Sequence, residues 1–205
     1  MARPVARRGE GRERVMEAAL NLFAEHGVGE TSLQMIADEL GVTKAAVYFQ
    51  FKAKEDIVLA VLQPAFEEMA TFIATAEAMP TQAARLDTAL TGLVDLVLNH
   101  RRVTAVLRGD RAAAQIVQAH QPLMELIDRL GRLLTGPRPS LSRKVSVAMI
   151  GGGLMLLNTE PDLAAIDSDR LRPELLRRAR ALLDLPPYQA KRGKAQALSD
   201  SATRT

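Results

Sequence analysis

Hydroxyl and amine side chains stand at the starts of two short helical patterns near residue 40. Thr31 and Ser32 precede one pattern, and Thr43 and Lys44 open the next. The first turn of a helix leaves backbone N–H groups free, so a hydroxyl beside them can cap the helix or help to bind a phosphate. The chemistry that these residue types offer is the binding of an anion.

Residues for catalysis or metal binding form no recognisable set. His26, His100 and His120 have no ligand partner at helical spacing, so we expect no metal. The chain has no Cys, which excludes a thiol nucleophile, and no Gly-x-Ser-x-Gly motif. The glycines at 151–153 do not form a phosphate loop, because no strand-like run precedes them and no Lys-Ser/Thr follows. We therefore predict that the protein is not an enzyme and has no cofactor.

Hydrophobic periodicity predicts the helices that position these residues. A first helix, which glycines end, carries one apolar stripe: Val15, Ala19, Leu22 and Phe23. Thr31, with Gln34 completing a capping box, is expected to open a second helix that stops at Gly41. Thr43 can cap a third, whose inward residues are Val47 and, beyond it, Phe51. Residues 31–51 therefore predict a helix-turn-helix that needs the first helix as its third wall.

Helical patterns continue through the rest of the chain. They cover residues 54–79, 81–99, 101–109, 111–134, 142–158 and 171–183, with a kink expected at Pro64 and a break or bend at Pro122. Aromatic residues make up only 3% of the chain, and Ala, Leu, Arg and Glu take the place of strand-forming residues. We predict an all-α fold with an N-terminal three-helix unit and a larger C-terminal helical domain.

Length, composition and charge indicate what kind of protein this is and how it is divided into parts. A chain of 205 residues with 47% hydrophobic and 25% charged residues suits one or two soluble domains. The longest uncharged stretch is shorter than the roughly 20 residues of a membrane span, and no secretory signal is present, so we expect a cytoplasmic protein. The net charge of +3 says little, but the first 14 residues hold five arginines against two glutamates. The predicted parts are residues 1–54 with a flexible basic arm at 1–11, residues 55–186, and a flexible tail at 187–205.

Residues 14–59 resemble the tetracycline-repressor (TetR) family. The motifs are Ala18-Ala19-x-x-Leu22-Phe23-x-x-x-Gly27, then Thr31-Ser32-x-x-x-Ile36-Ala37, then Gly41-Val42-Thr43-Lys44-x-x-Val47-Tyr48-x-x-Phe51-x-x-Lys54-Glu55. The rest of the chain is similar only in architecture. The resemblance implies a homodimeric transcriptional regulator, usually a repressor. Its N-terminal domain would bind a palindromic operator in double-stranded DNA, and a small molecule in its C-terminal domain would release it.

The resemblance also implies where DNA is contacted. A recognition helix that begins at Lys44 would lie in the major groove with its first turn toward the base edges. The Tyr48 hydroxyl would meet a phosphate, and the lysines that follow would clamp others. The expected DNA-binding residues are Thr31, Ser32, Gln34, Thr43, Lys44, Ala45, Ala46, Tyr48, Phe49, Lys52 and Lys54. Because the two alanines carry no donor, base readout would fall to Lys44, Gln34 and Gln50.

Several of these residues have a plainer interpretation. The threonines would cap any pair of helices, and the later lysines would elsewhere be solvated. Tyr48 and Phe49 could be core aromatics, although one short helix cannot bury both together with Val47. Two residues depart from the family pattern: Ala45 stands where Gly is frequent, and Ala53 leaves the fourth helix without a Ser or Asn cap.

The glycines at 151–153 need a structural reason, because each costs a helix roughly 1 kcal/mol relative to Ala. Close helix contact at a dimer interface or room for a ligand would each explain them. The resemblance implies that the last two long helices form a two-fold interface. The expected interface residues are Val147, Ile150, Gly151, Leu154, Leu175, Leu176, Ala179 and Leu183.

A pocket for a small apolar effector is expected in the C-terminal domain. Its predicted lining is Phe66, Met69, Ile73, Val97, His100, Leu107, Met124, Ile127 and Met155. Apolar stripes of this kind also describe plain core, and His100 also suits a helix C-terminus. Effector binding would shift the long helix near Pro64 and spread the two reading helices. The alternatives are a regulator of the same fold without a small-molecule switch, and a small helical enzyme, for which no catalytic set is present.

Overall fold

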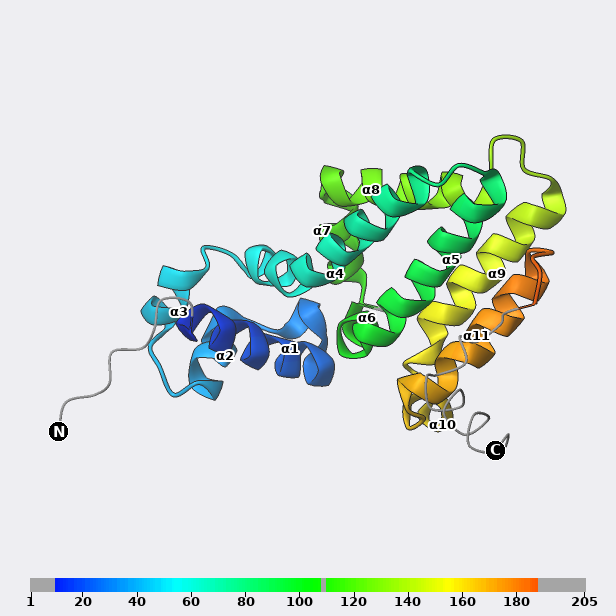
Figure 1. Ribbon diagram of the computed structural model, residues 1–205. Helices are drawn as coiled ribbons and strands as arrows, with labels where there is room; N and C mark the ends of the chain where they lie inside the picture. The colour runs from blue at the N-terminus through cyan, green and yellow to red at the C-terminus, as the bar shows by residue number, and fades with distance from the viewer. Residues whose placement is uncertain (1–9, 108–109, 188–205) are drawn as a thin grey trace, which may run out of the picture.

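Helices make up nearly all of the chain that the structure describes, residues 10–107 and 110–187 of a computed structural model (Figure 1). In chain order they are α1 (Glu10–Glu30), α2 (Leu33–Glu39), α3 (Lys44–Gln50), α4 (Lys54–Glu77), α5 (Gln82–Asn99), α6 (Arg101–Leu107), α7 (Arg111–Ala119), α8 (Gln121–Thr135), α9 (Leu141–Leu157), α10 (Pro161–Ala164) and α11 (Ser168–Leu182). These described residues contain no strand, so the all-α prediction is confirmed. Residues 1–9 of the predicted arm and 188–205 of the predicted tail lie outside them.

The first hydrophobic core joins α1, α2, α3 and the N-terminal half of α4. Its fully buried members include Ala19, Phe23, Ile36, Ala37, Val47, Phe51, Ile57, Val58 and Leu62. The chain leaves helical geometry at Gly27, whose φ of 81° favours glycine, where the sequence predicts the first helix to end. Because α2 and α3 are too short to be stable alone, this shared core is what holds the helix-turn-helix together.

The second core is larger and joins the C-terminal half of α4 with α5, α8, α9 and α11. Ile57 and Leu62 of α4 belong to the first core, whereas Met69 and Ile73 belong to the second. Figure 1 shows α4 running from the group formed by α1, α2 and α3 into the body of the molecule. The predicted boundary at residue 54 therefore marks the start of a helix that both cores share.

One glycine explains how α4 and α5 pack so extensively. Gly92 lies in the middle of α5, and a Cβ placed there would overlap the ring and the Cβ of Phe72 on α4. A hydrogen at this position leaves room for the ring of Phe72, which packs against the second core. The helix thus gives up some intrinsic stability at Gly92 in exchange for an aromatic contact.

The break predicted at Pro122 is confirmed: helices α7 and α8 meet at His120, because Pro122 stands in the first turn of α8, where a missing N–H costs nothing. The region before and around α11 differs from the predicted helices. The short α10 was not predicted, and α11 begins at Ser168, three residues before the predicted start. Pro173 lies inside α11 near its N-terminus, where few intrahelical bonds are lost.

Among the described helices, α4 is long and apolar enough to cross a membrane by length and composition alone. Glu67 and Glu68 lie in the middle of this helix, and its buried side chains belong to both cores. A helix shared by two hydrophobic cores needs an apolar face for packing within the protein. The composition of α4 is therefore accounted for by the fold.

Candidate nucleic-acid interface

Two capped helices form the helix-turn-helix. The Ser32 hydroxyl accepts a hydrogen bond from the Met35 amide at 3.2 Å, and the Thr43 hydroxyl accepts one from the Ala46 amide at 3.3 Å. Between them Gly41 takes a φ of 63°, which turns the chain from α2 into α3. Val47 is fully buried and fixes the side of α3 that faces the first core. The predicted cap at Thr43 and the inward position of Val47 are confirmed.

Thr31 does not have its predicted place at the surface. Its side chain is 1% exposed, and its hydroxyl donates to the carbonyls of Gly27 at 2.7 Å and Leu22 at 3.3 Å. The helix begins two residues later, so Ser32 is the cap, and the Gln34 amide donates to Asp38 rather than completing a capping box. The predictions of a cap and a phosphate contact at Thr31 are wrong, because its hydroxyl is used inside the fold.

The outward side of α3 is exposed and largely apolar. Lys44, Ala45 and Ala46 are exposed, and beyond the buried Val47 the side chains of Tyr48 and Phe49 are 48% and 79% exposed. One short helix therefore does not bury three consecutive positions, as its periodicity predicts. We call Lys44, Ala45, Ala46, Tyr48 and Phe49 the α3 surface.

Lys52 lies beside Tyr48 at the end of this surface. Its ammonium nitrogen donates to the Tyr48 carbonyl at 3.2 Å and lies 5.7 Å from the centre of the tyrosine ring. A shallow hollow of about 430 Å³ lies between Lys44, Ala45, Tyr48, Phe49 and Lys52. A lysine at each end and a phenol between them make this side of α3 suited to a polyanion.

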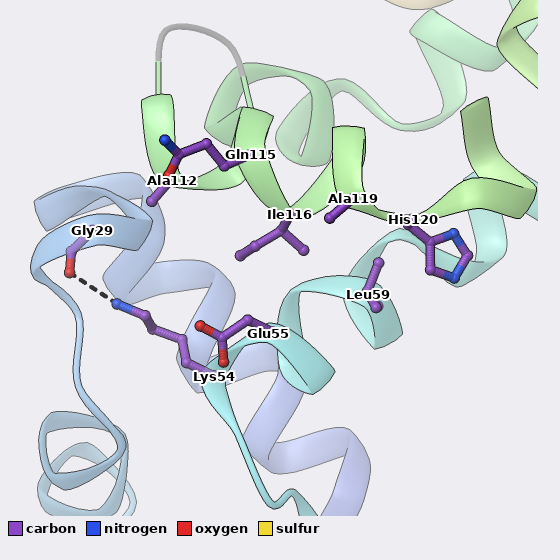
Figure 2. Close-up of a pocket in the computed structure, with 9 residues that line it drawn as sticks. All are labelled: Gly29, Lys54, Glu55, Leu59, Ala112, Gln115, Ile116, Ala119 and His120. Carbon is purple, nitrogen blue, oxygen red and sulfur yellow. Dashed lines mark hydrogen bonds between the residues drawn. The ribbon is translucent and has the colours of Figure 1, made fainter.

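Lys54 has an internal role instead of the predicted phosphate contact. Its ammonium donates to the carbonyls of Val28 at 2.5 Å, Gly29 at 2.8 Å and Thr31 at 2.8 Å, and Figure 2 shows the bond to Gly29. An ammonium has three N–H groups, so all of its donors are used. Lys54 therefore fastens residues 27–31, which we call the α1–α2 turn, to the start of α4. This assignment corrects the sequence prediction.

Asp110 holds the same turn from the other side. Its carboxylate caps α7 by accepting from the Ala113 amide at 2.8 Å and accepts from the Val28 amide at 2.5 Å. Burial by itself would raise the pKa of Asp110, but hydrogen bonds from Ala113, Val28 and neighbouring amides outweigh it and lower the pKa below its ordinary value of 3.8. Sequence reasoning missed this residue. An Asp before a helical run predicts a cap, but it does not reveal a contact 82 residues away.

The predicted dimer residues lie mostly inside the protein. Ile150 and Leu154 of α9, Leu176 and Ala179 of α11, and Leu183, which follows α11, are buried in the second core. Val147, Gly151 and Leu175 are half-buried. The prediction is wrong for the five buried residues, because it chose the side of each helix that packs within the chain.

The opposite side of α9 is exposed and apolar. It carries Leu141, Val145, Met149, Gly152 and Leu156, which we call the α9 surface. Leu141 is 78% exposed and Met149 is 58% exposed. A Cβ added at any of the glycines 151–153 would meet no atom of the chain within 4 Å. These residues recur along one side of a helix and leave open space beside its backbone.

The predicted effector residues do not line a single cavity in the structure. Met69, Ile73 and Val97 are buried in the second core, Phe66, His100 and Met124 are half-buried, Ile127 and Met155 are exposed, and the side chain of Leu107 lies outside the described residues. The His100 ring nitrogen lies 2.8 Å from a Glu68 oxygen, which joins the end of α5 to α4. The effector pocket stays a prediction.

A hollow of about 470 Å³ lies instead at the junction of α4 and α7 (Figure 2). Its lining combines apolar side chains such as Leu59 and Ile116 with Lys54, Glu55 and His120. Figure 2 shows Lys54, Glu55 and Leu59 of α4 facing Ile116 and Ala119 of α7, with Gly29 at one end of the hollow and His120 at the other. Within the described residues no cluster of three His, Asp or Glu side chains could hold a metal ion.

Comparison with known proteins gives a consistent result. Residues 15–61 match the family described as bacterial regulatory proteins, tetR family. The HTH-type transcriptional regulator SrpR of Pseudomonas putida is 43% identical over 63 residues, which span 30% of each chain. A TetR-family regulator from Bordetella parapertussis aligns with a TM-score of 0.62 over 87% of this chain and 98% of its own, at 18% identity. The regulator FadR from Bacillus subtilis, solved with stearoyl-CoA, has a TM-score of 0.54 over 82% and 96%, also at 18% identity.

The fold and the α3 surface define a helix-turn-helix protein with a larger helical domain. Residues 15–61 match the tetR family of bacterial regulatory proteins, which identifies the N-terminal part of the chain as the DNA-binding domain of a transcriptional regulator. The sequence match to SrpR covers less than a third of that relative, and the structural likeness extends the shared fold to the rest of the chain.

Proposed function

We propose that this protein binds a palindromic operator in double-stranded DNA as a cytoplasmic homodimer and represses transcription until a small apolar effector releases it. The observation that carries the proposal is the α3 surface. Its residues stand outward on a capped helix whose other side is locked into the core by Val47. Lysines lie at both ends of the hollow beside it. A rigid, cationic, exposed helix of this size suits a major groove.

The DNA contacts follow from the positions of the side chains. Lys44, in the first turn of α3, would approach a base edge, and Tyr48 with Lys52 would contact the phosphates along one strand. Ser32 is exposed at the start of α2 and would contact the backbone as well. Lys54 and Thr31 would support the interface from within, because their polar groups are engaged with carbonyls of the protein.

The second copy would pack on the α9 surface. Leu141, Val145, Met149 and Leu156 expose apolar groups along one side of α9, and a dimer would remove them from water. The glycines at 151–153 would allow the backbones of the two copies to approach closely. In such a dimer the two α3 helices would enter successive major grooves, roughly 35 Å apart.

The experiment that tests the DNA contacts uses duplexes selected by the protein from a randomised pool. Lys44→Ala should weaken binding about tenfold or more, and Tyr48→Phe by about three- to tenfold, since one base contact and one phosphate hydrogen bond are lost. Fluorescence anisotropy measures the affinity, and thermal unfolding checks the fold. Arg138→Ala, which removes a cation from the loop after α8, is the matched control. Unchanged binding by both α3 variants would contradict the assignment.

An effector with a long apolar chain is the ligand class that the family comparison supports. FadR, which shares the fold, was solved with stearoyl-CoA, and the predicted lining here is mostly apolar. A ligand that moved α4 would also move the α1–α2 turn, because Lys54 ties this turn to α4 and Asp110 ties it to α7. Thermal unfolding with stearoyl-CoA and shorter acyl-CoAs tests this: a raised Tm together with loss of DNA binding is expected.

A regulator without a small-molecule switch is the second candidate, and one observation favours it. Met69, Ile73 and Val97 are packed in the second core rather than around a cavity. In that case the larger domain would serve dimerisation or contact with another protein. No change in Tm with any acyl-CoA, and DNA binding that no such compound alters, would support this candidate over the first.

A further inference from the structure

The most exposed large apolar side chain of the described residues lies on the α3 surface. Phe49 is 79% exposed, and Ala45 and Ala46 lie one turn before it on the same side of the helix. Val42, in the turn before α3, adds a further exposed apolar group. An apolar patch between Lys44 and Lys52 suits a partner that offers apolar groups between anionic ones.

The two glutamines that were expected to read bases near this patch make contacts within the protein. The Gln34 amide donates to Asp38 at 2.8 Å within α2. The Gln50 amide lies beside Gly11 of α1, on the side of α3 that faces the protein. The prediction that these two glutamines read bases is therefore not supported by their positions, and Lys44 is the donor that remains in the first turn of α3.

The major groove offers one apolar group at the base edges, the C5 methyl of thymine, and Ala and Phe are side chains that contact it. Residues four apart on a helix have Cβ atoms about 6 Å apart, close to two base-pair steps of about 3.4 Å. Ala45 and Phe49 are spaced in this way. We propose that the α3 surface reads its operator through thymine methyl groups at Ala45, Ala46 and Phe49, with Lys44 at an adjoining guanine. This inference rests on the proposed function and specifies the class of DNA sequence that the site accepts.

The test removes single methyl groups from the DNA. Duplexes that the full-length protein enriches from a randomised pool are resynthesised with deoxyuridine in place of each thymine in turn, which changes the base by one methyl group. At each thymine that meets α3, affinity should fall about fourfold, the equivalent of ~0.8 kcal/mol for one buried carbon. Thymines outside the contacted positions should show no change. Fluorescence anisotropy at fixed salt measures each affinity.

Protein variants show which side chain contacts which thymine methyl group. Phe49→Ala should abolish the effect of deoxyuridine at one position in each half-site while other positions keep it. Lys44→Ala should keep the methyl dependence and lose the preference for guanine. Leu163→Ala, which shortens a partly exposed leucine on α10, is the control. Because Phe49 is so exposed, its variant should unfold at nearly the wild-type temperature.

The possible outcomes distinguish a failure of the methyl readout from a failure of operator binding. Enrichment of duplexes whose affinity does not respond to deoxyuridine at any position would overturn the methyl readout and leave operator binding intact. A Phe49→Ala variant with the wild-type deoxyuridine profile would also overturn it. Failure to enrich or bind any duplex would overturn both the inference and the proposed function, and the α3 surface would then belong to another kind of partner.

Discussion

The α3 surface and the α9 surface both expose apolar side chains, yet they differ in what surrounds them. Phe49 on α3 and Leu141 on α9 are 79% and 78% exposed. The α3 surface occupies a seven-residue helix with Lys44 and Lys52 at its ends, whereas the α9 surface runs along a 17-residue helix with open space beside its glycines. Two surfaces with equally exposed apolar side chains therefore need not bind the same kind of partner. The length of each surface and the lysines at the ends of the α3 surface are the grounds on which we propose DNA as the partner of α3 and a second copy as the partner of α9.

The largest effect is expected from a charge on the α9 surface. Met149→Glu would place two carboxylates near the two-fold axis of the proposed dimer, where they would be desolvated and would repel each other. We expect a monomer by analytical ultracentrifugation and a loss of operator affinity of about 10²- to 10⁴-fold, since the two reading helices would no longer bind together. Leu163→Glu is the control for adding a charge at an exposed apolar position. A dimeric Met149→Glu protein would show that the second copy does not bind there.

The second largest effect is expected from salt, which should weaken DNA binding by the α3 surface much more than dimerisation through the α9 surface. Lys44 and Lys52 would bring four cations of a dimer to the DNA, so DNA affinity should fall about 100-fold between 50 and 200 mM salt, because about four counterions must return to the DNA. Dimerisation through apolar groups should change little over the same range. Lys52→Ala should lower the salt slope by about one for each half-site. If dimerisation were as sensitive to salt as DNA binding, the difference between the two surfaces would not be one of charge.

Asp110→Asn tests how the α3 surface is held. The variant keeps the shape of the side chain but weakens its bonds to the Val28 and Ala113 amides, so the free energy of unfolding should fall by about 1–2 kcal/mol. DNA affinity should fall, whereas dimerisation should be unchanged. Hydrogen exchange of the Val28 amide measures the bond directly. Wild-type protection of this amide in the variant would contradict the role of Asp110.

The same residue predicts a dependence on pH. The pKa of Asp110 is lower in the folded protein than its ordinary value of 3.8, so its ionised form stabilises the fold above that value and the stabilisation is lost as pH falls through the folded pKa. The difference in stability between wild type and Asp110→Asn should be constant from pH 5 to 7 and shrink below about pH 4. Chemical denaturation at several pH values measures it. A difference that grew toward low pH would contradict this assignment.

The smallest effects on stability and dimerisation are expected from alanine substitutions at two glycines. Gly152→Ala meets open space within the chain and should stabilise α9 by about 1 kcal/mol, but it should weaken a dimer in which the two backbones approach closely. Gly92→Ala overlaps Phe72 and should destabilise the fold by about 1–3 kcal/mol without a direct effect on dimerisation. Thermal unfolding and sedimentation measure both. A tighter Gly152→Ala dimer would remove close approach as the reason for the glycines.

The helix-turn-helix could be predicted from the sequence because its signals are local. Thr43 as a cap, Gly41 as a turn and Val47 as an inward residue each depend on neighbours within a few positions. The prediction that Thr31 caps α2 was wrong because a helix start predicted from sequence is uncertain by one or two residues. The helix begins later than predicted, and the Thr31 hydroxyl lies in the interior instead of at the surface.

The sides of the longer helices could not be predicted in the same way. Helix α9 carries Ile150 and Leu154 on its inward side and Val145 and Met149 on its outward side, so its periodicity does not show which side faces the chain's own core. The sequence identifies the residues as apolar. Only packing against α5, α8 and α11 decides which of them remain exposed.

From the sequence alone came the helical fold, the reading helix and its apolar outward residues, because propensity, caps and spacing act over a few residues. The tertiary structure decided which polar groups are free to act. The sequence predicts that the Lys54 ammonium contacts DNA and that the Asp110 carboxylate only caps a helix. In the folded protein Lys54 binds carbonyls of the α1–α2 turn, and Asp110 also binds the Val28 amide of that turn. A side chain can donate or accept only a limited number of hydrogen bonds, and folding determines whether the protein or its partner receives them.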